Sequence, residues 1–424
     1  MKLTVIGAGS TYSPEIFDGI IRRKDSLPID QVALMDIDAN KLSIVGGFIE
    51  RMLCAGGLEN VRCIQTDDLD TALRGADYVI AQIRVGQLPA RVKDEKIPLK
   101  YGLIGQETTG IGGFFNALRT IPPILHIAKR MEELCPDAWL INFSNPSGIV
   151  AQAVQSNSSI KMVGLCNCPI NTLMDCRAWL NDPEASIEYV GLNHLSWVTK
   201  VMSHQENELQ QLLQQGAMGT AKNVPHIAFS MEMLLAAGGI PSSYLNYFYL
   251  REEQLERMKN AKLSRGEECM QIEKELLELY QQPELTKKPE QLSKRGGALY
   301  SEAAVSLIDC IHNDRNETHV VDIRNNGAIP FLRDDDVVEI SSTVRRDSIT
   351  PQPITVMPNE QIVALIQTVK AYERLTVEAA LTGDRIAALR ALMVHPLVGD
   401  FNLAQQCFDE MLEAHREYLP QFFN

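Results

Sequence analysis

The sequence predicts an α/β protein made of two domains. Short apolar strands alternate with amphipathic helices over the first 162 residues, whereas the later pattern is looser and mixes helices with a few strands. The chain opens with a β-branched strand at 2–6 that runs into Gly7-Ala8-Gly9, as a Rossmann-type sheet does. We therefore expect a Rossmann-type domain at 1–162 and an α+β domain at 163–424 of this 424-residue chain.

The expected elements follow one another along the chain. In the first domain we expect strands at 2–6, 31–35, 61–65, 78–83 and 138–143. Between them we expect helices at 15–23, 42–55, 69–74 and 116–134. Polar and glycine residues fill 105–115, so we expect a ligand-approaching loop there. In the second domain, helical periodicity occurs at 206–215, 231–237, 252–280, 360–381, 384–393 and 403–418. Alternation predicts a half-buried strand at 337–344.

Composition excludes several classes of partner. The net charge of −14 argues against nucleic acid or an anionic membrane surface as the main partner. The longest apolar run, 138–154, is interrupted by polar residues and a proline, so no membrane span is expected. Nine scattered cysteines without a secretory signal predict free thiols in the reducing cytoplasm.

The amino-terminal glycines predict a nucleotide site. Glycines let the backbone turn and approach a pyrophosphate at a helix N-terminus, although Tyr12 stands where the full fingerprint has a third glycine. Asp36 ends the second strand, where an acid accepts hydrogen bonds from the adenosine ribose and repels a 2′-phosphate. This pattern favours NAD over NADP. The residues that we expect to bind the cofactor are Gly7, Gly9, Ser10, Thr11, Asp36 and Asn142.

Cys166 and His194 form a candidate metal site. Each follows an apolar strand and has an asparagine beside it, Asn167 or Asn193. Thiolate and imidazole suit a divalent transition metal, and two protein ligands would leave the open positions that a catalytic metal needs. The alternative is that Cys166 fills the core and His194 is an ordinary satisfied polar residue.

Arg84 is placed to hold an anion. It follows the buried strand 78–83, and ligands of such sheets bind at the carboxyl ends of strands. A surface arginine in a loop is the alternative.

Seven short motifs occur in the order seen in glycoside hydrolase family 4, which the chain resembles over essentially its whole length. The motifs are Gly7-Ala8-Gly9-Ser10-Thr11, Ile83-Arg84-Val85-Gly86, Gly105-Gln106-Glu107-Thr108-Thr109-Gly110, Asn142-Phe143-Ser144-Asn145-Pro146, Gly164-Leu165-Cys166-Asn167, Gly191-Leu192-Asn193-His194 and Asn325-Asn326-Gly327. This family uses NAD instead of the two-carboxylate mechanism of most glycosidases. The Cys166-Asn167 pair resembles the 6-phospho-β-glucosidase branch.

The resemblance implies an activity and a set of residues. It implies hydrolysis of 6-phospho-β-glucosides, such as cellobiose 6-phosphate, to glucose 6-phosphate and an aglycone. The implied route is redox-assisted: NAD⁺ takes a hydride from carbon 3, a base removes the carbon 2 proton, the aglycone is eliminated, water adds and the hydride returns. A divalent metal takes part, Mn²⁺ being favoured. The resemblance also implies a second domain like that of lactate and malate dehydrogenases and a homodimer or homotetramer. Tyr244 matches the family's general base, and Glu107 lies in a family motif without a role that we can derive. The implied substrate residues are Arg84, Asn145, Asn167 and Arg265.

Three other functions stay open at this stage. An NAD-dependent 2-hydroxy-acid dehydrogenase shares the fold, but such enzymes use a His/Asp pair without a cysteine ligand. A 6-phospho-α-glucosidase or α-galactosidase of the same family is the second alternative. The third is a non-catalytic NAD-binding sensor, against which the intact Cys166, His194 and Tyr244 argue.

Overall fold

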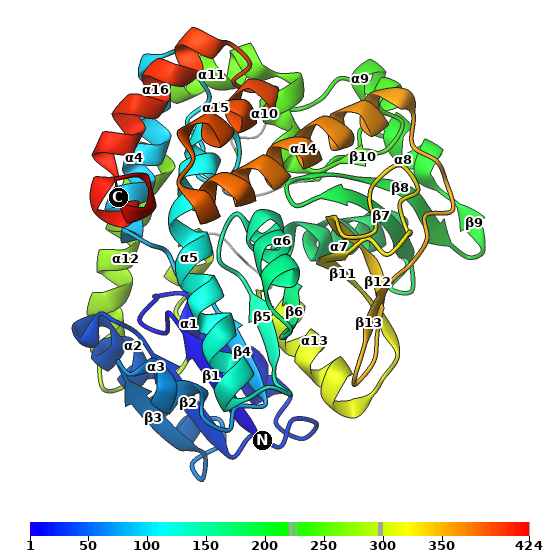
Figure 1. The fold of residues 1–424 in the computed structure, drawn as a ribbon. Helices are drawn as coiled ribbons and strands as arrows, with labels where there is room; N and C mark the ends of the chain where they lie inside the picture. The colour runs from blue at the N-terminus through cyan, green and yellow to red at the C-terminus, as the bar shows by residue number, and fades with distance from the viewer. Residues whose placement is uncertain (220–223, 225–226, 296–299, 424) are drawn as a thin grey trace.

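Six parallel strands form the centre of the protein in the order β3-β2-β1-β4-β5-β6 (Figure 1). The computed structural model describes residues 1–219, 224, 227–295 and 300–423. The strands are β1 (Lys2–Ile6), β2 (Gln31–Met35), β3 (Arg62–Thr66), β4 (Tyr78–Ala81), β5 (Trp139–Asn142) and β6 (Lys161–Gly164). This is the order of a Rossmann sheet, whose ligand crevice lies between β1 and β4 at the carboxyl ends. The predicted α/β class is confirmed.

Helices connect these strands, and most of them lie at the residues where the hydrophobic periodicity predicts helices. They are α1 (Ser13–Arg22), α2 (Ala39–Ala55), α3 (Leu69–Leu73), α4 (Gln87–Lys100), α5 (Gly110–Leu134) and α6 (Ser147–Asn157). Helix α4 was not predicted, because its buried face includes Arg91, Asp94 and Glu95 and so lacks an apolar stripe. Helix α5 begins at Gly110 and not at residue 116. A Cβ at Gly112 would lie 2.3 Å from the carbonyl oxygen of Gln106, so a glycine-rich sequence typical of a loop serves close helix packing here.

The carboxyl-terminal half extends the same sheet. β11 (Glu317–Arg324) pairs antiparallel with β6, and β12 (Val337–Val344) and β13 (Ile349–Pro351) follow it. A second, smaller sheet contains β10 (Ile240–Pro241), β8 (Leu195–Ser203) and β7 (Ser186–Leu192), with β9 (Glu206–Asn207) on β8. Because the large sheet continues past residue 162, the boundary between 162 and 163 stays a prediction.

The remaining helices surround the two sheets. They are α7 (Asn167–Leu180), α8 (Leu209–Gln214), α9 (Met231–Ala237), α10 (Asn246–Tyr249), α11 (Arg251–Asn260), α12 (Arg265–Tyr280), α13 (Tyr300–Asn313), α14 (Glu360–Thr382), α15 (Arg385–Val394) and α16 (Phe401–Ala414), with short 3₁₀ turns η1 (Ser243–Leu245), η2 (Glu290–Arg295), η3 (Arg416–Tyr418) and η4 (Pro420–Phe422). Helix α14 packs on α5 and α6, and α16 packs on α4, so the last helices close over the first half (Figure 1). Within the described residues, none of these helices has the length and apolarity to cross a bilayer.

The predicted single helix at 252–280 is wrong. The chain breaks between α11 and α12, and Ser264 starts α12 with a capping box in which its hydroxyl and the Glu267 carboxylate each bind the other's backbone N–H. The break matters for the site, because it fixes Arg265 at the first position of α12.

Candidate active site

A cavity of about 910 Å³ lies at the carboxyl ends of the parallel strands, within the range usual for ligand sites. The predicted residues that line it are Gly7, Gly9, Ser10, Asp36, Arg84 and Asn145. Further residues come from distant parts of the chain, among them Glu107 before α5, Glu273 on α12 and Arg295 in η2. The crevice of the sheet is therefore walled by both halves of the protein.

The glycines of the first turn allow a close approach of neighbouring atoms that a side chain would block. Gly7 has a φ of +85°, and a Cβ there would lie 2.8 Å from the carbonyl oxygen of Gln82. The N–H of Gly9 donates to Oδ2 of Asp36 at 2.7 Å, and the N–H of Asp38 donates to Oδ1 at 2.9 Å. Asp36 is thus fixed at the rim of the cavity, as binding to a ribose requires. The arrangement fits a dinucleotide.

Two of the residues predicted to bind the cofactor, Thr11 and Asn142, lie behind the cavity lining and not in it, as far as the described residues define that lining. Thr11 is buried, and its hydroxyl has no hydrogen-bond partner among the residues that the structure describes. Asn142 is buried, and its side chain exchanges two 3.0 Å hydrogen bonds with the backbone of Ser144. Neither belongs to the cavity wall in the described part of the chain. Their direct contact with a cofactor stays a prediction.

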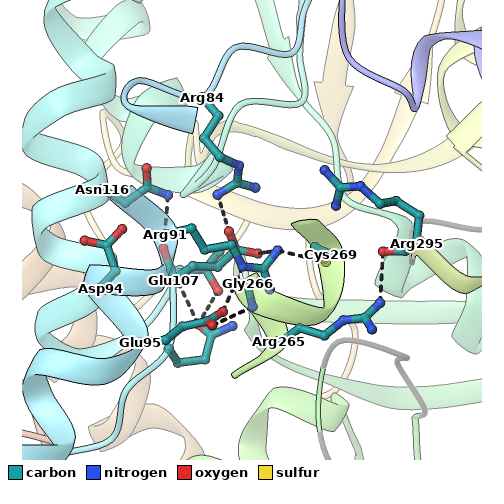
Figure 2. Close-up of polar contacts among 12 residues, drawn as sticks. Arg84, Arg91, Asp94, Glu95, Glu107, Asn116, Arg265, Gly266, Cys269 and Arg295 are labelled. Carbon is teal, nitrogen blue, oxygen red and sulfur yellow. Dashed lines mark hydrogen bonds and ion pairs between the residues drawn. The ribbon is translucent and has the colours of Figure 1, made fainter. Parts of the chain in front are cut away.

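Glu107 lies between two arginines (Figure 2), and all three residues line the cavity. It accepts a hydrogen bond from Arg84 and forms an ion pair with Arg91, whose Nη1 is 2.9 Å from Oε1 of Glu107. Nε of Arg91 donates to Glu95 at 2.8 Å. Burial by itself would raise the pKa of Glu107, but Arg84 and Arg91 outweigh that effect and hold the pKa at about 2. Glu107 is therefore a fixed negative charge.

Arg295 faces Arg84 across the cavity, and both guanidinium groups point into the same space (Figure 2). Burial first, and then the charges of Arg91 and Arg84, lower the pKa of Arg295. Cationic groups that converge on one cavity form a site for an anion. The sequence carried no signal for Arg295, because η2 approaches the sheet only through the tertiary fold.

Arg265 takes a different position from the one expected of a cavity residue. Its Nη2 donates to the carbonyl oxygens of Lys294 at 2.9 Å and Arg295 at 3.0 Å, and its Nη1 pairs with Glu268. Arg265 is not part of the cavity wall as far as the described residues define it. Direct substrate contact by Arg265 stays a prediction, and in this structure the side chain supports the end of η2.

Cys166 and His194 lie together, as the metal hypothesis requires. Sγ of Cys166, at the N-cap of α7, is 3.3 Å from Nε2 of His194, which sits in the β7–β8 turn. Nδ1 of His194 bonds Oγ1 of Thr108 at 3.0 Å, and that hydroxyl is 2.7 Å from Oε1 of Gln106. Since an amide oxygen only accepts, the Thr108 hydroxyl donates to it and accepts from Nδ1–H. Nε2 therefore carries no proton, and its lone pair, which faces Sγ of Cys166, can bind a metal.

Cys168 completes a cluster that the sequence analysis missed. Its Sγ, Sγ of Cys166 and a ring nitrogen of His194 all lie within 4.8 Å of one another. The Cys-x-Cys spacing was the available signal. The donor set of sulfur and imidazole nitrogen fits a transition metal.

Tyr244 packs directly on this cluster. Its ring in η1 stacks on His194, with centroids 3.7 Å apart and an interplanar angle of 8°. Tyr247 lies 6.2 Å from it between ring centroids. Burial, followed by the neighbouring Cys168 and Cys166, raises the pKa of Tyr244 well above its ordinary value. Asn167, directly after Cys166, begins α7 and is half-buried.

Comparison with known proteins identifies relatives over the whole chain. The model of the family 4 glycosyl hydrolases matches residues 2–181, and that of the family's C-terminal domain matches residues 189–398. A probable 6-phospho-beta-glucosidase of Bacillus subtilis (strain 168) is 44% identical over 100% of this chain and 98% of its own. The structure of the 6-phospho-beta glucosidase from Thermotoga maritima with manganese, NAD⁺ and glucose-6-phosphate is 35% identical, with a TM-score of 0.89 over 99% of both chains. Malate dehydrogenase from Plasmodium falciparum, 13% identical, shares the fold alone, with a TM-score of 0.57 over 90% of this chain and 98% of its own.

We predict that Glu107→Gln destabilises the protein near neutral pH, because the half-buried Arg84 and the buried Arg91 would each lose an ion-pair partner. A carboxylate with a depressed folded-state pKa stabilises above its unfolded value of ~4.3 and loses that contribution as the pH falls through the folded value. The gap in free energy of unfolding between wild type and variant should therefore narrow between about pH 5 and pH 2. Urea denaturation across this range measures it.

Glu339→Gln provides the matched control. Glu339 is buried, accepts hydrogen bonds from Asn193 and Ser196, and has its pKa raised by burial and then by Asp322. The pH dependence for Glu339→Gln should have the opposite sign. The free energy of unfolding of the wild type should rise relative to that of the variant as the pH falls. A gap for Glu107→Gln that stays constant with pH would show that the Glu107 charge is not held by the arginines.

Proposed function

The chain belongs to family 4 of the glycosyl hydrolases, and on this premise we propose that it hydrolyses 6-phospho-β-glucosides, such as cellobiose 6-phosphate, to glucose 6-phosphate and an aglycone. The relatives from B. subtilis and T. maritima, named for this activity, support the choice of substrate class. The observation that carries the proposal is that three parts meet at the consecutive residues Glu107 and Thr108. Glu107 lines the cavity that joins a dinucleotide crevice to an arginine-lined anion site, and Thr108 bonds His194 of a metal-ligating cluster stacked on a tyrosine.

NAD and a divalent metal, Mn²⁺ in particular, are the proposed cofactors. Gly7, Gly9, Ser10 and Asp36 would hold the dinucleotide, with Thr11 and Asn142 behind them. Cys166 and His194 would hold the metal. When bound, NAD⁺ supplies a reversible hydride acceptor for carbon 3 of the sugar, and the metal polarises the oxygen on that carbon.

The sugar phosphate would bind between Arg84 and Arg295. Both guanidinium groups line the cavity, and a phosphate can accept from each. Arg265 would contribute by holding the carbonyl oxygen of Arg295, and Asn145 on the same wall would bind a substrate hydroxyl. Asn167, next to the ligand Cys166, is proposed for a second hydroxyl.

Tyr244 is the proposed general base that removes the proton from carbon 2. Burial disfavours its phenolate, so the chain alone holds its pKa above the ordinary value of ~10. A tyrosinate therefore needs a cation beside it. The ring stacks on His194, one of the proposed metal ligands, so a bound divalent ion would supply that charge where the base needs it.

The alternatives are less well supported. A 2-hydroxy-acid dehydrogenase uses a His/Asp pair and has no use for a sulfur ligand such as Cys166. Hydrolysis of 6-phospho-α-glucosides differs only in the substrate's anomeric configuration and is decided by the assay below. A homodimer or homotetramer and a cytoplasmic location are further proposals that rest on the sequence.

We expect turnover of a chromogenic 6-phospho-β-glucoside only when NAD⁺ and Mn²⁺ are both present. We expect no turnover of the 6-phospho-α-glucoside that carries the same chromophore. Because the hydride returns to the sugar in each cycle, NADH should not accumulate. The assay follows release of the chromophore and absorbance of NADH in the same sample, with each cofactor withheld in turn. NADH formed in proportion to product would favour a dehydrogenase, and preference for the α-glucoside would move the protein to the other branch.

Tyr244→Phe should lower kcat by ~10²–10⁴-fold, the usual effect of losing a general base. The ring and its stack on His194 remain, so the thermal midpoint should change little. Tyr247→Phe and Tyr249→Phe, two nearby tyrosines, are the matched controls and should keep most of the activity. If Tyr247→Phe loses activity and Tyr244→Phe keeps it, the base has been assigned to the wrong tyrosine.

A further inference from the structure

We infer that Cys168 is a third protein ligand of the metal, so that the ion is held by two thiolates and one imidazole. This inference rests on the metal of the proposed function, but it concerns a residue to which that function gives no role. It is separable from the reaction, because metal coordination can be measured without substrate or NAD.

The distances allow one ion to reach all three side chains. Sγ of Cys166 and Nε2 of His194 are 3.3 Å apart, and Sγ of Cys168 lies within 4.8 Å of the other two donor atoms. With metal–sulfur bonds of ~2.3 Å and metal–nitrogen bonds of ~2.0 Å, donor atoms of a tetrahedral site lie roughly 3.5–3.8 Å apart. Small side-chain shifts therefore suffice.

The three donor side chains are buried together. Cys166, Cys168 and His194 are 9%, 5% and 6% exposed. A metal ion that binds them would therefore replace contacts among these three side chains and not their contacts with bulk water. Cys166 is the N-cap of the 14-residue α7, and its Sγ accepts a hydrogen bond from the N–H of Cys168 at 3.4 Å. The start of α7 therefore holds both sulfur atoms beside His194.

A second thiolate has chemical consequences. Three protein ligands leave an open coordination position, as a catalytic metal requires. Two sulfurs also shift preference toward softer ions such as Zn²⁺, Co²⁺ and Fe²⁺, relative to Mn²⁺. The alternative is that Cys168 only packs in the small apolar cluster with Tyr244, Tyr247 and Ile104.

Cobalt binding counts the thiolates directly. The full chain is titrated with Co²⁺ alone, and the sulfur-to-cobalt charge-transfer absorbance is recorded per bound ion. In Cys168→Ser we expect this absorbance to fall by about half, since one of two thiolates is lost, and the Kd for Co²⁺ to rise by at least ~10-fold, because even loss of an outer-shell partner costs that much. Cys176→Ser, which changes a fully buried cysteine of the same helix, should match the wild type.

An unchanged absorbance per bound cobalt in Cys168→Ser would overturn the inference, as would a wild type that binds no Co²⁺. Cys168→Ala repeats the comparison if the serine variant does not fold, which circular dichroism reports. A wild type with a two-thiolate spectrum that cleaves no 6-phosphoglucoside would support the ligand assignment while contradicting the proposed function. If the wild type cleaves the substrate but Cys168→Ser leaves the cobalt spectrum unchanged, the proposed function would be supported and the ligand assignment contradicted.

Discussion

The candidate site depends on one buried carboxylate. Glu107 pairs with both Arg84 and Arg91, and the next residue, Thr108, bonds the imidazole of His194. The anion-binding wall and the metal cluster are therefore fixed to consecutive residues of one short segment, and their separation is set by the backbone. Without the Glu107 charge, Arg84, Arg91 and the nearby Arg295 would repel one another in a poorly solvated space.

The site lies where the parallel sheet meets the smaller sheet. Cys166 follows β6, the last parallel strand, and His194 occupies the two-residue turn between β7 and β8. His194 has a φ of 65°, in the left-handed region that side chains other than glycine seldom adopt. Such conformations cluster at functional sites, where surrounding contacts offset their cost. Here the contacts are the Thr108 hydrogen bond and the stacked Tyr244 ring.

The sequence predicted the elements that are governed by local patterns. Apolar strands ending in glycine or polar residues identified the parallel sheet, and β2 was predicted to the residue at Gln31–Met35. Helix α4 escaped because it buries charged residues, and the helix predicted across 252–280 was wrong because Ser264 caps a new helix there. The geometry brings Cys166, His194 and Tyr244 together as the resemblance implied. Arg295 enters the cavity from η2, a long-range approach that no periodicity encodes, whereas Cys168 was visible only as a spacing.

The central claim is that the glycosidic bond breaks after a proton leaves carbon 2, and hydrolysis in deuterium oxide tests it most directly. Glucose 6-phosphate released by the protein with NAD⁺ and Mn²⁺ is isolated, and its carbon 2 is examined by NMR. If Tyr244 removes that proton and solvent returns one, the product should carry solvent deuterium at carbon 2. Product that retains protium at carbon 2, formed at the full rate, would contradict the account, because direct displacement at the anomeric carbon leaves that hydrogen untouched.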